Sequence, residues 1–282
     1  MEFFYASIKP YMERTIKKLA QMKVSDFVTK DLYAPSVHLL KNPGKLLRPA
    51  FVFVGSEIVG SRGSDYSDLA AAVELIHVSS LIQDDIIDKS SARRGTTAVH
   101  VKYGVNAAML AIDALVSKAI SLAAPYGNEV IRSLSNAALE MCAGELMDSE
   151  QNSKCSKLQQ YLRMARLKSA SLIGVSLSIV ATHKKSAIEK TLYNIGVYAG
   201  LAFQIRDDVI DFLEGGASDS GSNIIDVLGT KGGIKHAVSR AVSLNNSYLD
   251  RSARLLKTLP KCQGTAMLAN YMSLIRLNPN SV

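Results

Sequence analysis

The chain has 282 residues, of which 48% are apolar and 6% aromatic, with 33 Lys and Arg against 25 Asp and Glu. Its 18 glycines and 7 prolines make up about 9% of the chain, below the roughly 12% typical of globular proteins. This shortage of turn-forming residues excludes a β-sandwich, a repeated-turn architecture or a disordered chain. Three scattered cysteines exclude a disulfide framework or a thiolate metal site and indicate a reducing compartment. The net charge of +8 suits nucleic acid, an anionic membrane surface or small phosphorylated ligands.

Long proline-free stretches, from Pro49 to Pro125 and from there to Pro260, favour long helices. Apolar residues repeat at helical spacing most clearly over residues 8–19, 67–89 and 192–213. Breaks are predicted at 41–45, 61–67, 90–97, 125–128, 149–156 and, rich in Gly and Ser, 214–233. Apolar helical patterns resume promptly after each break, so we expect one all-α domain over residues 1–282.

The N-terminal residues 1–14 lack the apolar core of a signal peptide. The longest apolar stretch, around Leu172–Ala181, is interrupted by serines and is too short to span a bilayer. We therefore expect a cytoplasmic protein without a transmembrane segment.

One acidic motif, Asp-Asp-x-x-Asp, occurs twice, at residues 84–88 and 207–211. On a helix, residues four apart share a face, so the first and last aspartates of each motif should converge. Both motifs lie in apolar sequence, where ionised carboxylates are costly without a partner. Grouped carboxylate oxygens suit Mg²⁺, which completes its shell with water and phosphate oxygens. The alternative is that the motifs are two acidic patches on solvated helix faces. This reading is the weaker one, because both copies lie in apolar sequence.

Basic residues lie on both sides of the first motif. Arg93 and Arg94 follow it, and Lys45 and Arg48 precede it at the predicted start of a helix. Arginine recognises phosphate through paired hydrogen bonds and lysine adds a compact charge, so these side chains could form a diphosphate clamp opposite the metal. His77, two turns before the motif on the same face, could donate to the same anion, although a satisfied core histidine is the alternative reading.

In this combination the chain resembles the trans-type polyprenyl diphosphate synthases, of the geranylgeranyl or medium-chain type. The matching stretches, in the family's order and spacing, are GKLLRP (44–49), ELIHVSSLIQDDIIDKSSARRG (74–95), VKYGVNAAMLAIDAL (101–115), KSA (168–170) and LAFQIRDDVID (201–211). The resemblance implies a bundle of long antiparallel helices around a deep central cavity, and a homodimer. It also implies a Mg²⁺-dependent prenyltransferase that condenses isopentenyl diphosphate with an allylic diphosphate, with three metal ions when substrate is bound.

The resemblance also assigns roles to individual positions. Catalytic roles fall on Asp84, Asp85, Asp88, Arg93, Lys168, Asp207, Asp208 and Asp211. The implied metal ligands are Asp84, Asp88 and Asp207. Contacts to isopentenyl diphosphate are implied for Lys45, Arg48, His77 and Arg94, and contacts to the allylic diphosphate for Arg93, Lys168, Ser169 and Gln204.

Three positions depart from the family pattern. Gln83 stands where many members have His, and Ser169 replaces Thr while keeping the hydroxyl. In the loop after the second motif, Asn223 takes the place of an Asp, and Lys231, the best candidate for the loop's substrate-binding lysine, follows a short insertion.

Product length should depend on the residues before the first motif. In the family, aromatic residues four or five positions before the first Asp close the pocket of short-chain enzymes. Here these positions are Ser80 and Ser79, and the same face continues with Ile76 and Val73. Small side chains predict a deep pocket and a product from geranylgeranyl to about hexaprenyl diphosphate, unless another helix supplies the floor.

Three other functions are alternatives to a prenyltransferase. A terpene cyclase usually carries a different second metal motif, and a non-catalytic partner subunit typically loses an acidic cluster or the basic clamp. A nucleic-acid-binding protein would account for the positive charge, but no recognised motif or aromatic–basic stripe supports it. We expect small diphosphates as partners, no nucleic acid, and a product that is delivered to a membrane.

Overall fold

The structure, a computed structural model, describes residues 2–61, 64–149, 157–215, 222–229 and 233–278. The α-helices are α1 (Glu2–Ala20), α2 (Lys30–Ser36), α3 (Leu47–Ile58), α4 (Ser67–Ile87), α5 (Val99–Tyr103), α6 (Val105–Ala123), α7 (Asn128–Ser149), α8 (Leu158–Ala165), α9 (Ser171–His183), α10 (Glu189–Leu213), α11 (Ile224–Gly229), α12 (Ile234–Leu256) and α13 (Gln263–Ile275). Short 3₁₀ segments cover Val24–Phe27, Leu39–Lys41 and Ala124–Tyr126, and a π-helical turn covers Arg166–Ala170.

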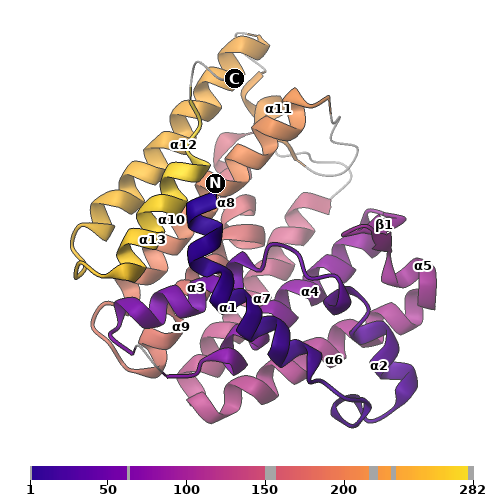
Figure 1. Cartoon of the computed structure of the whole chain (residues 1–282). Coiled ribbons are helices and arrows are strands. Elements are labelled where there is room, and N and C mark those ends of the chain that lie inside the picture. Colours follow the sequence, from indigo (N-terminus) through magenta and orange to yellow (C-terminus); the bar gives the residue numbers. More distant parts are fainter. Residues whose placement is uncertain (1, 62–63, 150–156, 216–221, 230–232, 279–282) are drawn as a thin grey trace.

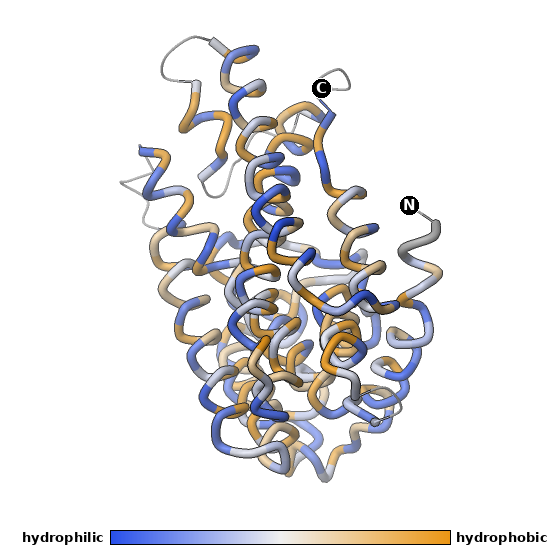
Figure 2. The backbone as a smooth tube through the Cα atoms, turned by 90° about the vertical axis from the view of Figure 1, so that its left-hand side faces the viewer, coloured by the Kyte–Doolittle hydropathy of each residue, from blue (hydrophilic) through white to orange (hydrophobic). Residues whose placement is uncertain are grey.

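The bundle is organised around α4 and α9, the helices with the most continuous burial. Every residue of α9 from Ser171 to Thr182 is buried, which a helix apolar on all sides requires. Helix α6 packs on α4, and α10 packs on both α9 and α12 (Figure 1). Along the outer helices hydrophilic and hydrophobic segments alternate, as expected where one side of each helix faces the core (Figure 2). The all-α prediction is confirmed.

The three strongest helix predictions agree with the structure. The predicted helices at residues 8–19, 67–89 and 192–213 correspond to α1, α4 and α10. The breaks were less well predicted. Residues 90–97 contain a small antiparallel hairpin of Ala92–Arg93 (β1) with Thr96–Thr97 (β2), and the Gly/Ser-rich segment 214–233 contains α11. The rest of that segment, and most of the break at 149–156, lies outside the described residues.

The hairpin matters because it carries Arg93 and Arg94. Arg94 has φ +51°, in the left-handed region, and Gly95 follows with φ +72°, so the chain reverses direction there. His38 is 6% exposed, and its Nε2 lies 2.8 Å from the Thr97 carbonyl oxygen. The return strand is thereby attached to the segment that leads into α3.

Two helical stretches are long and apolar enough to cross a membrane, judged by length and composition. Leu158–His183 is 83% buried and forms the centre of the bundle, whereas Val105–Tyr126 is only 28% buried. Val105, Met109 and Leu110 of α6 are 46%, 56% and 59% exposed. This helix thus presents an apolar outer face.

Candidate active site

The first aspartate motif lies at the C-terminal end of α4. Asp84 is half-buried near the end of the helix, and Asp88 caps it, donating its backbone N–H to the Asp84 carbonyl oxygen over 2.8 Å. Burial, followed by the nearby Glu145 carboxylate, raises the pKa of Asp84 to about 7. Burial also raises the pKa of Asp88. A cation at this position would relieve both effects.

The middle aspartate of the motif has a different environment. Asp85 is fully buried, and Arg93 approaches its Oδ1 with Nε at 2.7 Å and Nη2 at 2.5 Å. Consecutive residues on a helix point about 100° apart, so Asp85 cannot share the face of Asp84. The structure brings Asp85 together with Arg93, away from its two neighbours in the motif.

Helix α7 adds two acidic residues that were missed in the sequence. Glu145 is buried and Asp148 is half-buried, and Lys168 Nζ lies 2.7 Å from a carboxylate oxygen of each. Burial alone lowers the pKa of Lys168, but these two carboxylates raise it above its ordinary value, so the ammonium stays charged. A signal was present: two carboxylates three residues apart in the largely apolar run CAGELMD resemble the aspartate motifs in kind.

Lys168 and Ser169 are presented by the π-helical turn between α8 and α9. Gly144 of α7 lies against this turn so closely that a Cβ at that position would collide with the Lys168 backbone. Ser169 donates its hydroxyl to Gln204 Oε1 at 2.8 Å. A π turn often marks a functional position, because it turns side chains away from the face that a regular helix would give them.

The second aspartate motif lies near the C-terminal end of α10, and its three members also differ. Burial raises the pKa of Asp207 to about 6, an effect that Arg206 opposes. Arg206 Nη1 lies 3.5 Å from Asp207 Oδ1, and Asp211 is exposed. The outer pair Asp207 and Asp211 share a face, as predicted.

Asp208 is 6% exposed, and both of its carboxylate oxygens accept hydrogen bonds. It accepts from the Tyr161 hydroxyl (2.7 Å), Gln204 Nε2 (2.8 Å) and the Ile224 backbone N–H (2.9 Å). Asn223 Nδ2 donates to the Asp208 carbonyl oxygen over 3.0 Å. Asp208 therefore fixes the start of α11, which explains how a helix forms in a Gly/Ser-rich segment.

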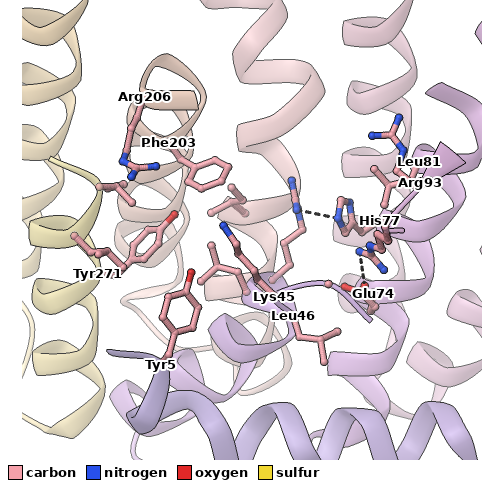
Figure 3. Close-up of a pocket in the computed structure, with 17 residues that line it drawn as sticks. Tyr5, Lys45, Leu46, Glu74, His77, Leu81, Arg93, Phe203, Arg206 and Tyr271 are labelled. Carbon is pink, nitrogen blue, oxygen red and sulfur yellow. Dashed lines mark hydrogen bonds and ion pairs between the residues drawn. The ribbon is translucent and has the colours of Figure 1, made fainter. Parts of the chain in front are cut away.

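A pocket of about 310 Å³ opens among α1, α3, α4, α10 and α13 (Figure 3). On one side it is basic, with Lys45, Arg48, Arg93, Arg94 and His77. On the other side aromatic and aliphatic residues of α1, α10 and α13 form the wall: Tyr5, Phe203, Tyr271, Leu274 and Ile275. The combination suits a ligand with an anionic head and a small apolar body.

The basic side has donors without acceptors. Arg48 Nη1 lies 3.2 Å from His77 Nε2, and Arg94 Nη2 lies 3.1 Å from a Glu74 oxygen. Among the described residues, the buried atoms Arg48 Nε and Arg94 Nη1 find no hydrogen-bond partner. Burial, then Arg48 and Arg94, lowers the pKa of His77 well below its ordinary value, so the ring is neutral and accepts from Arg48. Buried donors of this kind indicate an anion site.

Most of the candidate residues gather in these two regions, but the predicted product-length residues do not line the pocket. Val73, Ile76 and Ser79 are buried, and the hydroxyls of Ser79 and Ser80 donate to carbonyl oxygens of their own helix. Val73 and Ile76 pack in one cluster with residues of α7 and α9: Met141, Leu172 and Val175. Lys231 lies outside the described residues.

Within the described ranges, no group of three or more His, Cys, Asp or Glu side chains is arranged to hold a metal ion. The donors that are present nevertheless fit Mg²⁺. Asp84 and Asp207 are carboxylates whose pKa values are raised by burial, and Mg²⁺ needs only one or two protein carboxylates when phosphate oxygens complete its shell.

The comparisons with known proteins agree with this geometry. The family model described as Polyprenyl synthetase matches residues 29–227. A geranylgeranyl pyrophosphate synthase of Geoglobus acetivorans is 34% identical over 74% of this chain and 70% of its own length. Heptaprenyl diphosphate synthase component 2 of Geobacillus stearothermophilus is 29% identical over 83% of this chain and 85% of its own length. The crystal structure of geranylgeranyl pyrophosphate synthetase from Pyrococcus horikoshii Ot3 superimposes with a TM-score of 0.84 at 26% identity, covering 98% and 99% of the two chains.

Fold and site together define an all-helical isoprenoid synthase. The chain belongs to the polyprenyl synthetase family, and it is a trans-prenyltransferase that elongates isoprenyl diphosphates.

Proposed function

We propose that the protein condenses isopentenyl diphosphate with an allylic diphosphate in a Mg²⁺-dependent, head-to-tail reaction, as one domain over residues 1–282. The observation that carries this proposal is the pocket with unpaired guanidinium nitrogens on one side and an apolar wall on the other. A diphosphate supplies the acceptors that Arg48 and Arg94 lack, and a five-carbon isopentenyl group fits against Phe203 and Leu274.

In this assignment Lys45, Arg48 and Arg94 hold the diphosphate of isopentenyl diphosphate. His77 acts through Arg48, since its Nε2 accepts from that guanidinium and a neutral ring leaves Nδ1 as its donor. His77 would then act on the anion indirectly, whereas the sequence suggested direct donation.

The allylic diphosphate is assigned to the acidic region. Asp84, Asp88 and Asp207 would hold Mg²⁺, with Arg93, Lys168 and Gln204 as further contacts to the diphosphate. Glu145 and Asp148 hold the Lys168 ammonium in this region, each through a carboxylate oxygen 2.7 Å from Nζ. Bound Mg²⁺ neutralises the charge that develops on the departing diphosphate.

The reaction breaks the bond between the allylic carbon and the diphosphate oxygen, and the isopentenyl double bond then attacks the allylic cation. Loss of one proton, with the released diphosphate as its acceptor, gives a chain one isoprene unit longer. Lys168 and Arg93 stabilise the leaving group, and the basic pocket orients the double bond. The apolar wall keeps water from the cation.

We propose a product from geranylgeranyl to about hexaprenyl diphosphate. The absence of a bulky aromatic residue at Ser79 and Ser80 supports a tail that passes α4. Ile76, Leu172 and Val175 belong to one core cluster, which supports α9 as a second contributor to the floor. The relatives are named for both geranylgeranyl and heptaprenyl products, so the length must be measured.

We also propose a cytoplasmic homodimer that delivers its product to a membrane. The exposed apolar side chains of Val105, Met109 and Leu110 on α6 support burial against a second copy. Size-exclusion chromatography with light scattering tests this assembly, and Met109→Glu should shift the protein to a monomer.

Incubation with labelled isopentenyl diphosphate, Mg²⁺ and each allylic primer in turn, followed by chromatography of the products by length, tests the reaction. We expect elongation that depends on both the primer and Mg²⁺. No elongation with any primer would contradict the proposal.

A further inference from the structure

A buried carboxylate lines the pocket that is assigned to an anion. Glu74, in the middle of α4, is 1% exposed and shares the pocket with Lys45, Arg48 and Arg94. A negative charge in that position repels a diphosphate and is costly to bury. Its presence needs a reason other than direct contact with the substrate.

The geometry of Arg94 supplies that reason. Glu74 Oε1 lies 3.1 Å from Arg94 Nη2, while Arg94 Nη1 is buried without a partner among the described residues. The guanidinium also packs against Gly44, where a Cβ would come within 3.1 Å of Arg94 Nε. Glu74 and Gly44 thus hold the guanidinium of a residue that lines the pocket, and its Nη1 is left to donate to a ligand.

The preceding residue is held in the same way by a different carboxylate. Asp85 accepts from Nε of Arg93, and the residue after it, Arg94, has the left-handed φ of +51°. Glu74 and Asp85 are three helical turns apart on α4, which separates them by about 16 Å along the axis. Both arginines line the pocket, yet they pair with carboxylates at widely separated positions on α4.

We propose that Glu74 and Asp85 are positioning residues that commit these arginines to different substrates, Arg94 to isopentenyl diphosphate and Arg93 to the allylic diphosphate. The inference rests on the proposed function, because it uses that assignment of the two diphosphates. Neither carboxylate touches a substrate; each orients a guanidinium that does.

The direction in which diphosphate affinity changes when Glu74 is removed distinguishes a positioning role from a purely electrostatic one. If Glu74 acted only as a charge, its removal would strengthen binding of a diphosphate. If it positions Arg94, its removal weakens binding, and Glu74→Gln should retain part of the effect because the amide oxygen still accepts from Arg94.

The experiment measures, by calorimetry, binding of isopentenyl diphosphate alone, which cannot react without a primer. We expect Kd to rise about tenfold in Glu74→Ala and two- to threefold in Glu74→Gln. Asp85→Asn should leave this Kd within twofold of the unmodified protein and raise KM for the allylic primer instead. Glu189→Gln is the matched control: Glu189 accepts from the Thr182 hydroxyl at 2.9 Å, far along the chain from both arginines.

Unchanged or tighter binding in both Glu74 variants would overturn the inference, as would equal effects of Glu74 and Asp85 variants on both substrates. Melting temperatures and circular dichroism of each variant identify loss of fold, and Glu74→Gln, which keeps shape and acceptor, remains interpretable if Glu74→Ala unfolds. Arg94→Ala distinguishes failure of the pocket assignment from failure of the positioning role. If it leaves Kd unchanged, the assignment of the pocket fails; if it weakens binding and the Glu74 variants do not, only the positioning role fails.

Discussion

The basic pocket and the acidic region lie side by side, yet they are incomplete in opposite ways. In the pocket, buried guanidinium nitrogens of Arg48 and Arg94 lack acceptors. In the acidic region, Asp84 and Asp207 have pKa values raised to about 7 and about 6 because burial outweighs the nearby cations. One region needs an anion and the other a cation. A substrate diphosphate with Mg²⁺ meets both needs, and the comparison predicts that the two regions fail independently when altered.

The largest effect is expected from the acidic side. Asp84→Asn should lower turnover about a thousandfold, because the Mg²⁺ that we assign to this region would lose a ligand. Binding of isopentenyl diphosphate alone should stay within twofold, since its pocket is intact. Steady-state assays and calorimetry measure the two quantities, and a parallel loss of both would show that the regions are not separate.

Arg48→Ala tests the basic side. We expect KM for isopentenyl diphosphate to rise about a hundredfold, because the variant removes the proposed contact to the diphosphate and the partner of His77. KM for the allylic primer should change little. His77→Gln, which keeps a neutral hydrogen-bonding side chain, serves as the milder comparison, and an equal rise of both KM values would contradict the assignment.

Tyr161→Phe should act mainly on stability. It removes one of the hydrogen bonds to the buried Asp208 carboxylate, which should lower the free energy of unfolding by about 1–2 kcal/mol. Urea denaturation measures this change. Tyr198→Phe, on the stacked pair Tyr198 and Tyr248, is the control. A loss of primer binding without loss of stability would show that Tyr161 acts on the substrate instead.

The smallest effect concerns pH. The pKa of Asp84 is higher in the folded protein than its ordinary value of 3.8, so between about pH 4 and 7 the folded state binds more protons than the unfolded state. Stability without metal should therefore fall as the pH rises through this range. Added Mg²⁺ with pyrophosphate should raise the melting temperature by a few degrees more at pH 8 than at pH 5.5. Asp84→Asn should reduce that difference, and an equal shift at both pH values would refute the argument.

Much of this organisation could be predicted from the sequence. Helical spacing located α1, α4 and α10, and the repeated motif located both aspartate clusters. Helix geometry alone also separates Asp85 and Asp208 from the outer aspartates, because adjacent residues diverge by about 100°. Their partners, Arg93 and Tyr161, could not be predicted, because those contacts join distant segments of the chain.

Other features lacked a local signal. The hairpin carrying Arg93 and Arg94 has strands of only two residues. Helix α11 depends on hydrogen bonds that its first backbone N–H groups donate to Asp208 and Asn223, rather than on its own helix propensity. The three-residue spacing between Glu145 and Asp148 was a signal in the sequence. A search for the Asp-Asp-x-x-Asp motif alone does not find this pair.

The π-helical turn at Arg166–Ala170 has a consequence for how the sequence can change. A π turn holds one residue more than a turn of the regular helix around it, and this extra residue is absorbed within the turn. A one-residue deletion here would convert the turn to regular helix and move Lys168 and Ser169 out of the positions in which the turn presents them. The segment can exchange side chains, but it cannot change length. In this enzyme the number of residues between α8 and α9 is itself a functional property.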